Sequence, residues 1–154
     1  IVQEIRPGLG MIVADPIQIH QVLMNLCTNA GYAMKKDGGT LKVVLADVDV
    51  DEYTVAEHPG LSIPGRYVRL GVSDTGTGIP PEIMDRIFDP FFTTKPEGAG
   101  TGLGLAVSYG IVDKHSGQIG LENQPEGGVR AYIRLPKVAD WQEEVMSLEA
   151  RHAS

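Results

Sequence analysis

GAGTGLGL, at residues 98–105, is the stretch that decides the fold of this chain. Glycine stands at every second position from Gly98 to Gly104, and an apolar helical pattern at residues 103–115 follows. Successive backbone amides in such a loop form a concave nest for anions, and the N-terminus of a helix adds a positive dipole. A triphosphate suits both features, so the stretch predicts a phosphate-binding loop that leads into a helix.

The spacing of the glycines separates this loop from two other phosphate-binding loops. No Gly-Lys-Ser or Gly-Lys-Thr follows it, as a Walker A loop requires. It also lacks the Gly-x-Gly-x-x-Gly spacing of dinucleotide sites and protein kinases. Both of these classes are therefore excluded.

Two asparagines lie upstream in a predicted helix at residues 15–36. Their spacing of four places the Asn25 and Asn29 amides on one helix face. Such a pair is most often a solvent-facing stripe, and each Asn costs roughly half a kcal/mol relative to Ala. Beside a phosphate loop, however, an amide oxygen can ligate Mg²⁺, whose other ligands come from phosphates and water.

Asp74 follows an apolar strand pattern and precedes the sequence Thr-Gly-Thr-Gly-Ile. An Asp at this place is common in turns. The alternative is a buried carboxylate that accepts from the amino group of adenine, with glycines that let the backbone approach the ring. Such a carboxylate favours adenine over guanine.

Phe88, Phe91 and Phe92 are the three phenylalanines of the chain, and Thr-Thr-Lys follows them. They predict a small hydrophobic cluster that anchors one end of a mobile lid at residues 93–101. Lys95 of this lid is placed to meet a phosphate, although an exposed lysine is the ordinary alternative.

The remaining pattern predicts an α/β two-layer sandwich of the α+β class, with a mixed sheet and helices packed on one face. Asp15 is expected to cap the first long helix with Gln18 closing a capping box, and Gly117 to end the last helix. Residues 49–65 are expected to form an exposed hairpin loop. Expected strands lie within residues 1–14 and at 40–48, 66–73, 118–122 and 129–135, and expected helices lie at 15–36, 80–87 and 103–115.

Composition limits the possible functions. The 154 residues suggest one domain, and the net charge of -7 argues against nucleic-acid binding. No apolar run approaches the length of a membrane span, so we expect no membrane contact. The single cysteine, Cys27, fits a cytoplasmic location.

Taken together and in this order, four segments resemble the ATP-binding catalytic domain of sensor histidine kinases. The resemblance covers residues 1–136 and implies the Bergerat fold of the GHKL superfamily, with 137–154 as a helical tail or linker. The segments are Asn25–Ala30, Asp74–Ile79, Phe88–Lys95 and Gly100–Leu105.

The resemblance implies ATP and Mg²⁺ as ligands, with Asn29 as the Mg²⁺ ligand and Asp74 as the adenine reader. It implies Asn25, Asn29 and Lys95 as catalytic residues, and Asn25 stands where hydrolytic relatives carry Glu. The implied ATP-binding set is Asn25, Asn29, Ala33, Asp74, Gly76, Gly78, Ile79, Thr94, Lys95, Gly100, Thr101, Gly102, Leu103, Gly104 and Leu105.

Two positions depart from the family pattern. Relatives usually place a Thr after the third glycine motif, where this chain has Val129. Tyr32 replaces the Lys or polar residue that many relatives carry after the second Asn. Phosphate charge would then be met by Lys35, Lys36 or Lys95, and the sequence does not rank them.

No histidine of the chain fits a phosphoacceptor; His20, for example, is followed by Gln21 and not by an acidic residue. The resemblance therefore implies two partners: the dimerisation and histidine-phosphotransfer domain of the same kinase, and the receiver domain of a response regulator. Three alternatives stay open: an ATP-hydrolysing clamp of the gyrase and chaperone type, a non-catalytic ATP-sensing module, and a serine kinase that inhibits a transcription factor.

Overall fold

The fold is a single mixed sheet with helices packed on one face. The computed structural model describes residues 1–58, 60–61, 63–96, 98, 100, 102–138 and 149–153. The sheet order is β1-β2-β3-β5-β4; β1 runs parallel to β2, and the other neighbours are antiparallel. The strands are β1 (Val2–Ile5), β2 (Lys42–Val50), β3 (Gly65–Ser73), β4 (Gln118–Asn123) and β5 (Val129–Pro136).

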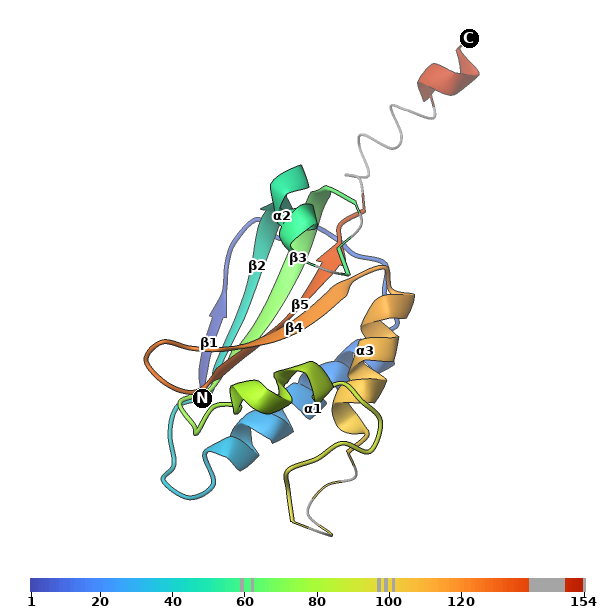
Figure 1. Cartoon of the computed structure of the whole chain (residues 1–154). Coiled ribbons are helices and arrows are strands. Elements are labelled where there is room, and N and C mark those ends of the chain that lie inside the picture. The colour runs from blue at the N-terminus through green and yellow to red at the C-terminus, as the bar shows by residue number, and fades with distance from the viewer. Residues whose placement is uncertain are drawn as a thin grey trace.

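Two long helices, α1 (Pro16–Ala33) and α3 (Gly104–Lys114), cover the same face of the sheet (Figure 1). A 3₁₀ helix, Pro81–Arg86, follows β3. This arrangement confirms the predicted two-layer α+β fold. No helix in the described part of the chain is both long and apolar enough to cross a membrane.

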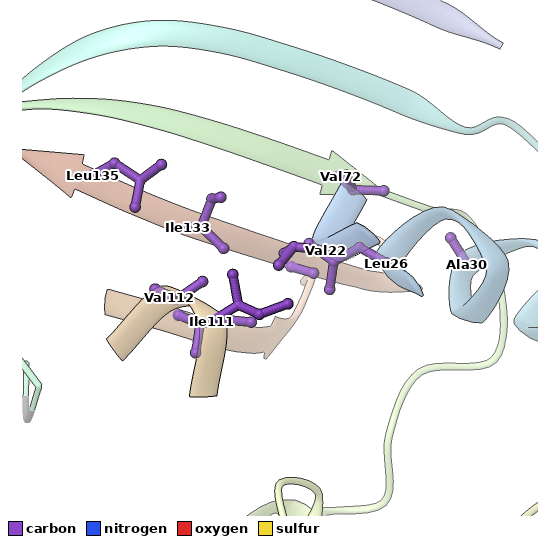
Figure 2. Packing of buried hydrophobic residues seen from close by; sticks show 10 residues of the cluster. Val22, Leu26, Ala30, Val72, Ile111, Val112, Ile133 and Leu135 are labelled. Carbon is purple, nitrogen blue, oxygen red and sulfur yellow. The ribbon is translucent and has the colours of Figure 1, made fainter. Parts of the chain in front are cut away.

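The core lies between these helices and the central strands (Figure 2). α1 contributes one residue per turn, because Val22, Leu26 and Ala30 recur at a spacing of four. Val112 of α3 and Ile133 of β5 are almost fully buried against them. Burying an aliphatic side chain stabilises a fold by about 1.5–3 kcal/mol, so this contact fixes both helices on the sheet.

The N-terminus of α1 is capped as predicted by Asp15, whose Oδ1 accepts from Ile17 N–H at 2.9 Å and Gln18 N–H at 3.4 Å. The predicted capping box is wrong about Gln18, whose side chain does not accept from the Asp15 N–H. The Asp15 N–H donates to Nε2 of His115, 3.0 Å away, at the end of α3. Because the His115 Nδ1 lies 2.7 Å from the Ile111 carbonyl, the imidazole joins the ends of the two helices.

α3 ends at Lys114 with His115 as its C-cap, and the left-handed position that follows falls one residue before Gly117. Ser116, with φ of 59°, takes the left-handed position that the sequence assigned to Gly117. Gly117 is needed for a different reason: a Cβ there would lie 2.4 Å from the Arg134 carbonyl oxygen. The glycine therefore allows the chain to turn directly against β5.

The expectation of an exposed hairpin loop over residues 49–65 is right about the antiparallel pairing of β2 and β3 and wrong about the connection between them. β2 continues to Val50, and the helix α2 (Glu52–Glu57) follows at the far end of the sheet (Figure 1). Asp51 caps α2 by accepting from the Thr54 N–H and hydroxyl, both at 2.7 Å. These hydrogen bonds lower the pKa of Asp51.

The predicted tail at 137–154 is tested only in part. Residues 139–148 lie outside the described residues, and residues 149–152 are helical. The boundary after residue 136 therefore stays a prediction.

Asp47 of β2 fastens the segment before α1 to the end of β5. Its carboxylate accepts from the Lys137 ammonium and from the Gly10 N–H. The hydrogen bond from Lys137 is the largest cause that lowers the pKa of Asp47 below its usual range.

We expect Asp47→Asn to lower the free energy of unfolding at neutral pH. Because the folded-state pKa of Asp47 is lowered, its contribution is present above the unfolded pKa of about 4 and is lost as pH falls through the folded value. Urea unfolding of both proteins between pH 7 and pH 2.5 measures this. Asp49→Asn on the same strand is the control, since Asp49 has no ion pair among the described residues. A difference between Asp47→Asn and the unmodified protein that does not depend on pH would contradict the assignment.

Candidate functional site

A cavity of about 850 Å³ lies beside α1, bordered by the segment after β3, residues 83–95 and the start of α3. It brings together most of the residues predicted from the sequence. Gly76 and Leu103 are not among its lining residues, and Thr101 lies outside the described residues. The predicted residues that line it are Asn25, Asn29, Ala33, Asp74, Gly78, Ile79, Thr94, Lys95, Gly100, Gly102, Gly104 and Leu105.

Asp74 is buried at the wall of this cavity, with 4% of its surface exposed. Its Oδ1 accepts from the Gly76 N–H at 2.9 Å and from the Val129 N–H at 3.2 Å. A buried carboxylate is costly unless it is hydrogen-bonded. Since both bonds end on one oxygen, the second oxygen is the available acceptor for a ligand.

Val129 stands where relatives usually carry a Thr, but the Asp74 carboxylate is still hydrogen-bonded at this position. The backbone N–H of Val129, and not a side-chain hydroxyl, holds Asp74. The Val129 side chain joins Val72, Leu121 and Ala131 in lining the cavity. The carboxylate therefore faces a space with apolar walls, which suits a flat base that carries one amino group.

Two glycines allow the backbone to approach Asp74 and α1 closely. A Cβ on Gly76 would lie 2.6 Å from the Ala33 carbonyl oxygen at the end of α1. Gly128 has φ of +81°, and its Cβ would lie 2.1 Å from the Asp74 carbonyl oxygen. Gly76 thus acts through packing, without lining the cavity, and Gly128 packs directly against the backbone of Asp74.

Asn25 connects α1 to the first turn of α3. Its Nδ2 donates to the Gly104 carbonyl and to the Ser108 hydroxyl, each at 3.2 Å. Ser108 is fully buried and also donates to the Gly104 carbonyl at 2.8 Å. Asn25 therefore orients the N-terminus of α3 at the cavity, and its predicted catalytic role stays a prediction.

Lys95 reaches across the cavity to α1. Its Nζ donates to Oδ1 of Asn29 at 3.3 Å and lies 4.7 Å from the centre of the Tyr32 ring. Lys35 lies farther from the same ring, at 5.9 Å, and Lys36 lines the cavity without such a contact among the described residues. Of the three candidate lysines, Lys95 is thus the one joined to the predicted metal ligand.

The predicted cluster of three phenylalanines is wrong for Phe91. Phe88 stacks against Tyr109 of α3 with ring centres 5.6 Å apart, and the Arg86 guanidinium lies 4.5 Å from the Phe92 ring. Phe91 is 74% exposed and has a positive φ of 66°. Its role is in the backbone, because its N–H donates to the Gly102 carbonyl at 2.8 Å.

The sequence missed two polar residues at the end of β4. Asn123 exchanges two hydrogen bonds with Ile79, accepting from its N–H at 2.8 Å and donating to its carbonyl at 2.7 Å. Gln124 donates to the Asp74 carbonyl at 2.9 Å. Both hold the 74–79 segment in place, and no motif marks them because their partners lie far away in the sequence.

Cys27 lies on α1 between the two asparagines and packs partly against the core. Burial raises the pKa of its thiol. A protonated thiol is a poor nucleophile, so Cys27 is part of the packing and not of the chemistry.

The polar groups of the cavity fit a metal ion that binds together with a phosphate ligand. The described residues contain no group of three or more His, Cys, Asp or Glu side chains able to hold a metal ion. Asn29 Oδ1 already attracts a cationic ammonium group. Mg²⁺ commonly binds one or two protein groups together with phosphates, and Asn29 meets that requirement.

Comparison with known proteins gives the family. Residues 14–139 match the family described as histidine kinase-, DNA gyrase B- and HSP90-like ATPases. The chain belongs to this family. The prediction of an ATP-binding catalytic domain of the sensor histidine kinase type is thereby confirmed.

Similar proteins support the same assignment. The sensor kinase CckA of Brucella abortus is 38% identical over 133 residues, which cover 86% of this chain and 14% of CckA. The catalytic domain of histidine kinase ThkA, in a nucleotide-free form, matches with a TM-score of 0.66 at 35% identity over 90% of this chain and 80% of that one. Full-length ShkA in complex with AMPPNP matches with a TM-score of 0.65 at 26% identity over 90% of this chain and 26% of ShkA.

We expect Gly76→Ala to disturb the contact between the 74–79 segment and α1. The added Cβ would meet backbone atoms of Ala33, so the two segments must move apart. This should lower the free energy of unfolding by about 1–3 kcal/mol. ATP affinity should also fall, because Asp74 lies in the displaced segment. Urea unfolding and calorimetry measure the two effects. Gly110→Ala in α3 is the control, since its Cβ would meet open space and should stabilise the helix by about 0.5–1 kcal/mol. Unchanged stability and affinity in Gly76→Ala would refute the close approach.

Proposed function

We propose that this chain binds Mg²⁺-ATP and presents its γ-phosphoryl group to a histidine on a separate dimerisation domain of the same kinase. The observation that carries the proposal is the shared cavity of Asp74, the Asn29–Lys95 pair and the first turn of α3. One cavity thus offers an acceptor for a base, cations for phosphates and an oxygen for a metal. This chain spans 14% of the length of CckA, and the proposal assigns the phosphoacceptor histidine to a separate domain.

The adenine amino group would donate to the free oxygen of Asp74. Val129 and Gly76 hold the other oxygen, so the acceptor is fixed before ATP arrives. The ring would lie against the apolar side chains of Val72 and Ala131. Guanine presents a carbonyl where adenine presents its amino group, and two facing acceptors repel.

The triphosphate would lie against the glycine-rich loop and the N-terminus of α3. Backbone N–H groups there point toward the cavity end of the helix, and the helix dipole favours negative charge. Lys95 adds a mobile positive charge. Asn29 Oδ1 would hold Mg²⁺ together with phosphate oxygens, and the metal would neutralise charge that develops during transfer.

Transfer itself would rest on positioning and charge neutralisation. The chain holds the phosphates, and the partner's imidazole would attack the γ-phosphorus as the bond to the ADP oxygen breaks. Asn25 supports transfer over hydrolysis, because its amide is committed to α3 and offers no carboxylate to activate water. A receiver domain of a response regulator would then take the phosphoryl group.

We expect Asp74→Asn to weaken ATP binding by roughly 10- to 100-fold, because it places a donor against the adenine amino group at about 1–3 kcal/mol. Asp74→Ala should abolish binding. The amide oxygen of Asn can still accept from the Gly76 and Val129 N–H groups, so the Asp74→Asn variant should keep the fold. Circular dichroism checks this. Calorimetry with ATP and GTP gives the affinities, with Asp113→Asn on the exposed side of α3 as the control. Unchanged ATP affinity in both Asp74 variants would remove the base-binding assignment.

We expect the isolated chain to bind ATP while neither labelling itself nor hydrolysing ATP quickly. The dimerisation domain of its parent kinase, added in trans with labelled ATP, should become labelled at its histidine. Asn29→Ala should slow this transfer at least about tenfold through loss of a metal ligand, whereas Gln21→Ala on the exposed face of α1 should not. Rapid Mg²⁺-dependent phosphate release without a partner, in a single-turnover assay, would favour the hydrolytic clamp instead.

A further inference from the structure

Asn29 makes a contact that competes with its proposed function. The oxygen that would ligate Mg²⁺, Oδ1, accepts a hydrogen bond from the Lys95 ammonium at 3.3 Å. Lys95 is half-buried at this place although it belongs to the segment between Phe92 and Gly98. A cationic side chain thus lies at the oxygen proposed as the metal ligand.

Tyr32 provides the surface on which this cation rests. One turn after Asn29 on α1, its ring lies 4.7 Å from the Lys95 Nζ. An ammonium at this distance from an aromatic face is attracted by the ring quadrupole. Lys95 therefore has two contacts on α1, the Asn29 oxygen and the Tyr32 ring, and both come from residues that line the cavity.

Lys95 and Mg²⁺ would compete at Asn29. Mg²⁺ requires its oxygen ligands at about 2.0–2.1 Å, so an ammonium 3.3 Å from the same oxygen would lie close to the metal. The two cations also repel each other. Phosphate oxygens, by contrast, offer the ammonium a new charged partner at the moment when the metal arrives.

We propose that Tyr32 is a positioning residue that holds Lys95 at Asn29 in the nucleotide-free protein, and that Mg²⁺-ATP moves Lys95 from Asn29 to the phosphates. The proposal rests on the proposed function. Binding of the metal, as well as of the nucleotide, would then change the contacts of the segment after Phe92 through Lys95. Tyr32 sets how strongly metal and lysine compete, so it tunes the Mg²⁺ dependence of ATP binding.

The test follows Lys95 directly by NMR. With ¹³C-labelled lysine the chain gives signals from six residues, and Lys95→Met identifies the one from Lys95. Without nucleotide, the ring current of Tyr32 should shift the ε-protons of Lys95 upfield. The shift should persist in Tyr32→Phe, which keeps the ring, and vanish in Tyr32→Leu. Lys35→Met is the control for the second lysine near the ring and should leave the Lys95 signal in place.

Nucleotide additions then separate metal from phosphate. ATP with EDTA should leave the upfield shift of Lys95 largely intact, and added Mg²⁺ should remove it. The ratio of ATP affinities with and without Mg²⁺ should rise roughly two- to fivefold in Tyr32→Leu, corresponding to loss of one cation–π contact, and stay unchanged in Tyr32→Phe.

Each result bears on a distinct claim. A Lys95 signal that does not depend on the Tyr32 ring, or one that ATP with EDTA moves as far as Mg²⁺-ATP does, overturns the inference even if ATP binds well. A ring-dependent Lys95 signal in a protein that fails to bind ATP supports the contact with Tyr32 and Asn29 and instead overturns the proposed function.

Discussion

The buried carboxylate of Asp74 is the constraint on which the site depends. A carboxylate with 4% exposure needs hydrogen bonds to stay in place. Its donors come from Gly76, two residues later, and from Val129, at the start of β5. The carboxylate therefore joins the end of β3 to the start of β5, and the antiparallel pairing Ser73↔Arg130 continues directly from this junction.

The junction explains the glycines around it. Gly128 precedes Val129, and any side chain there would collide with the Asp74 carbonyl. Gly76 brings the same segment against the end of α1. Asn123 and Gln124 secure the outer side of the segment through three backbone groups, which are the Ile79 N–H, the Ile79 carbonyl and the Asp74 carbonyl. This end of the cavity is thus held by hydrogen bonds and close backbone contacts from three parts of the chain.

The sequence predicted the parts of the site that are local in the chain. Spacing predicts the helix with Asn25 and Asn29 and the helix after the glycine-rich loop, but only the four motifs together single out the candidate site. It could not predict contacts made by long-range packing. Nothing near His115 indicates that its imidazole accepts from Asp15, one hundred residues earlier, and nothing near Asn123 indicates Ile79.

The errors have physical causes of the same kind. α2 was missed because its six residues are too few for an apolar period, although Asp51 and Thr54 carry a capping signal. Phe91 was placed in a hydrophobic cluster because of its side chain, whereas its backbone makes the contact that matters. Val129 lacks the hydroxyl of the Thr that relatives usually carry, but its backbone N–H makes a hydrogen bond to Asp74 that no side-chain pattern reveals.

The glycine-rich loop also differs from the uniform phosphate nest that its sequence suggests. The N–H of Phe91 donates to the Gly102 carbonyl, and a Cβ on Gly102 would lie 2.4 Å from the Phe91 carbonyl carbon. Gly102 therefore closes the base of the segment between residues 92 and 101. A Cβ on Gly98 would meet nothing within 4 Å, and a Cβ on Gly100 would meet only side-chain atoms, those of Lys95 and Thr93. Because the base is closed by backbone contacts of Phe91 and Gly102 that do not involve Lys95, the exchange of partners proposed for Lys95 would leave the start of α3 in place.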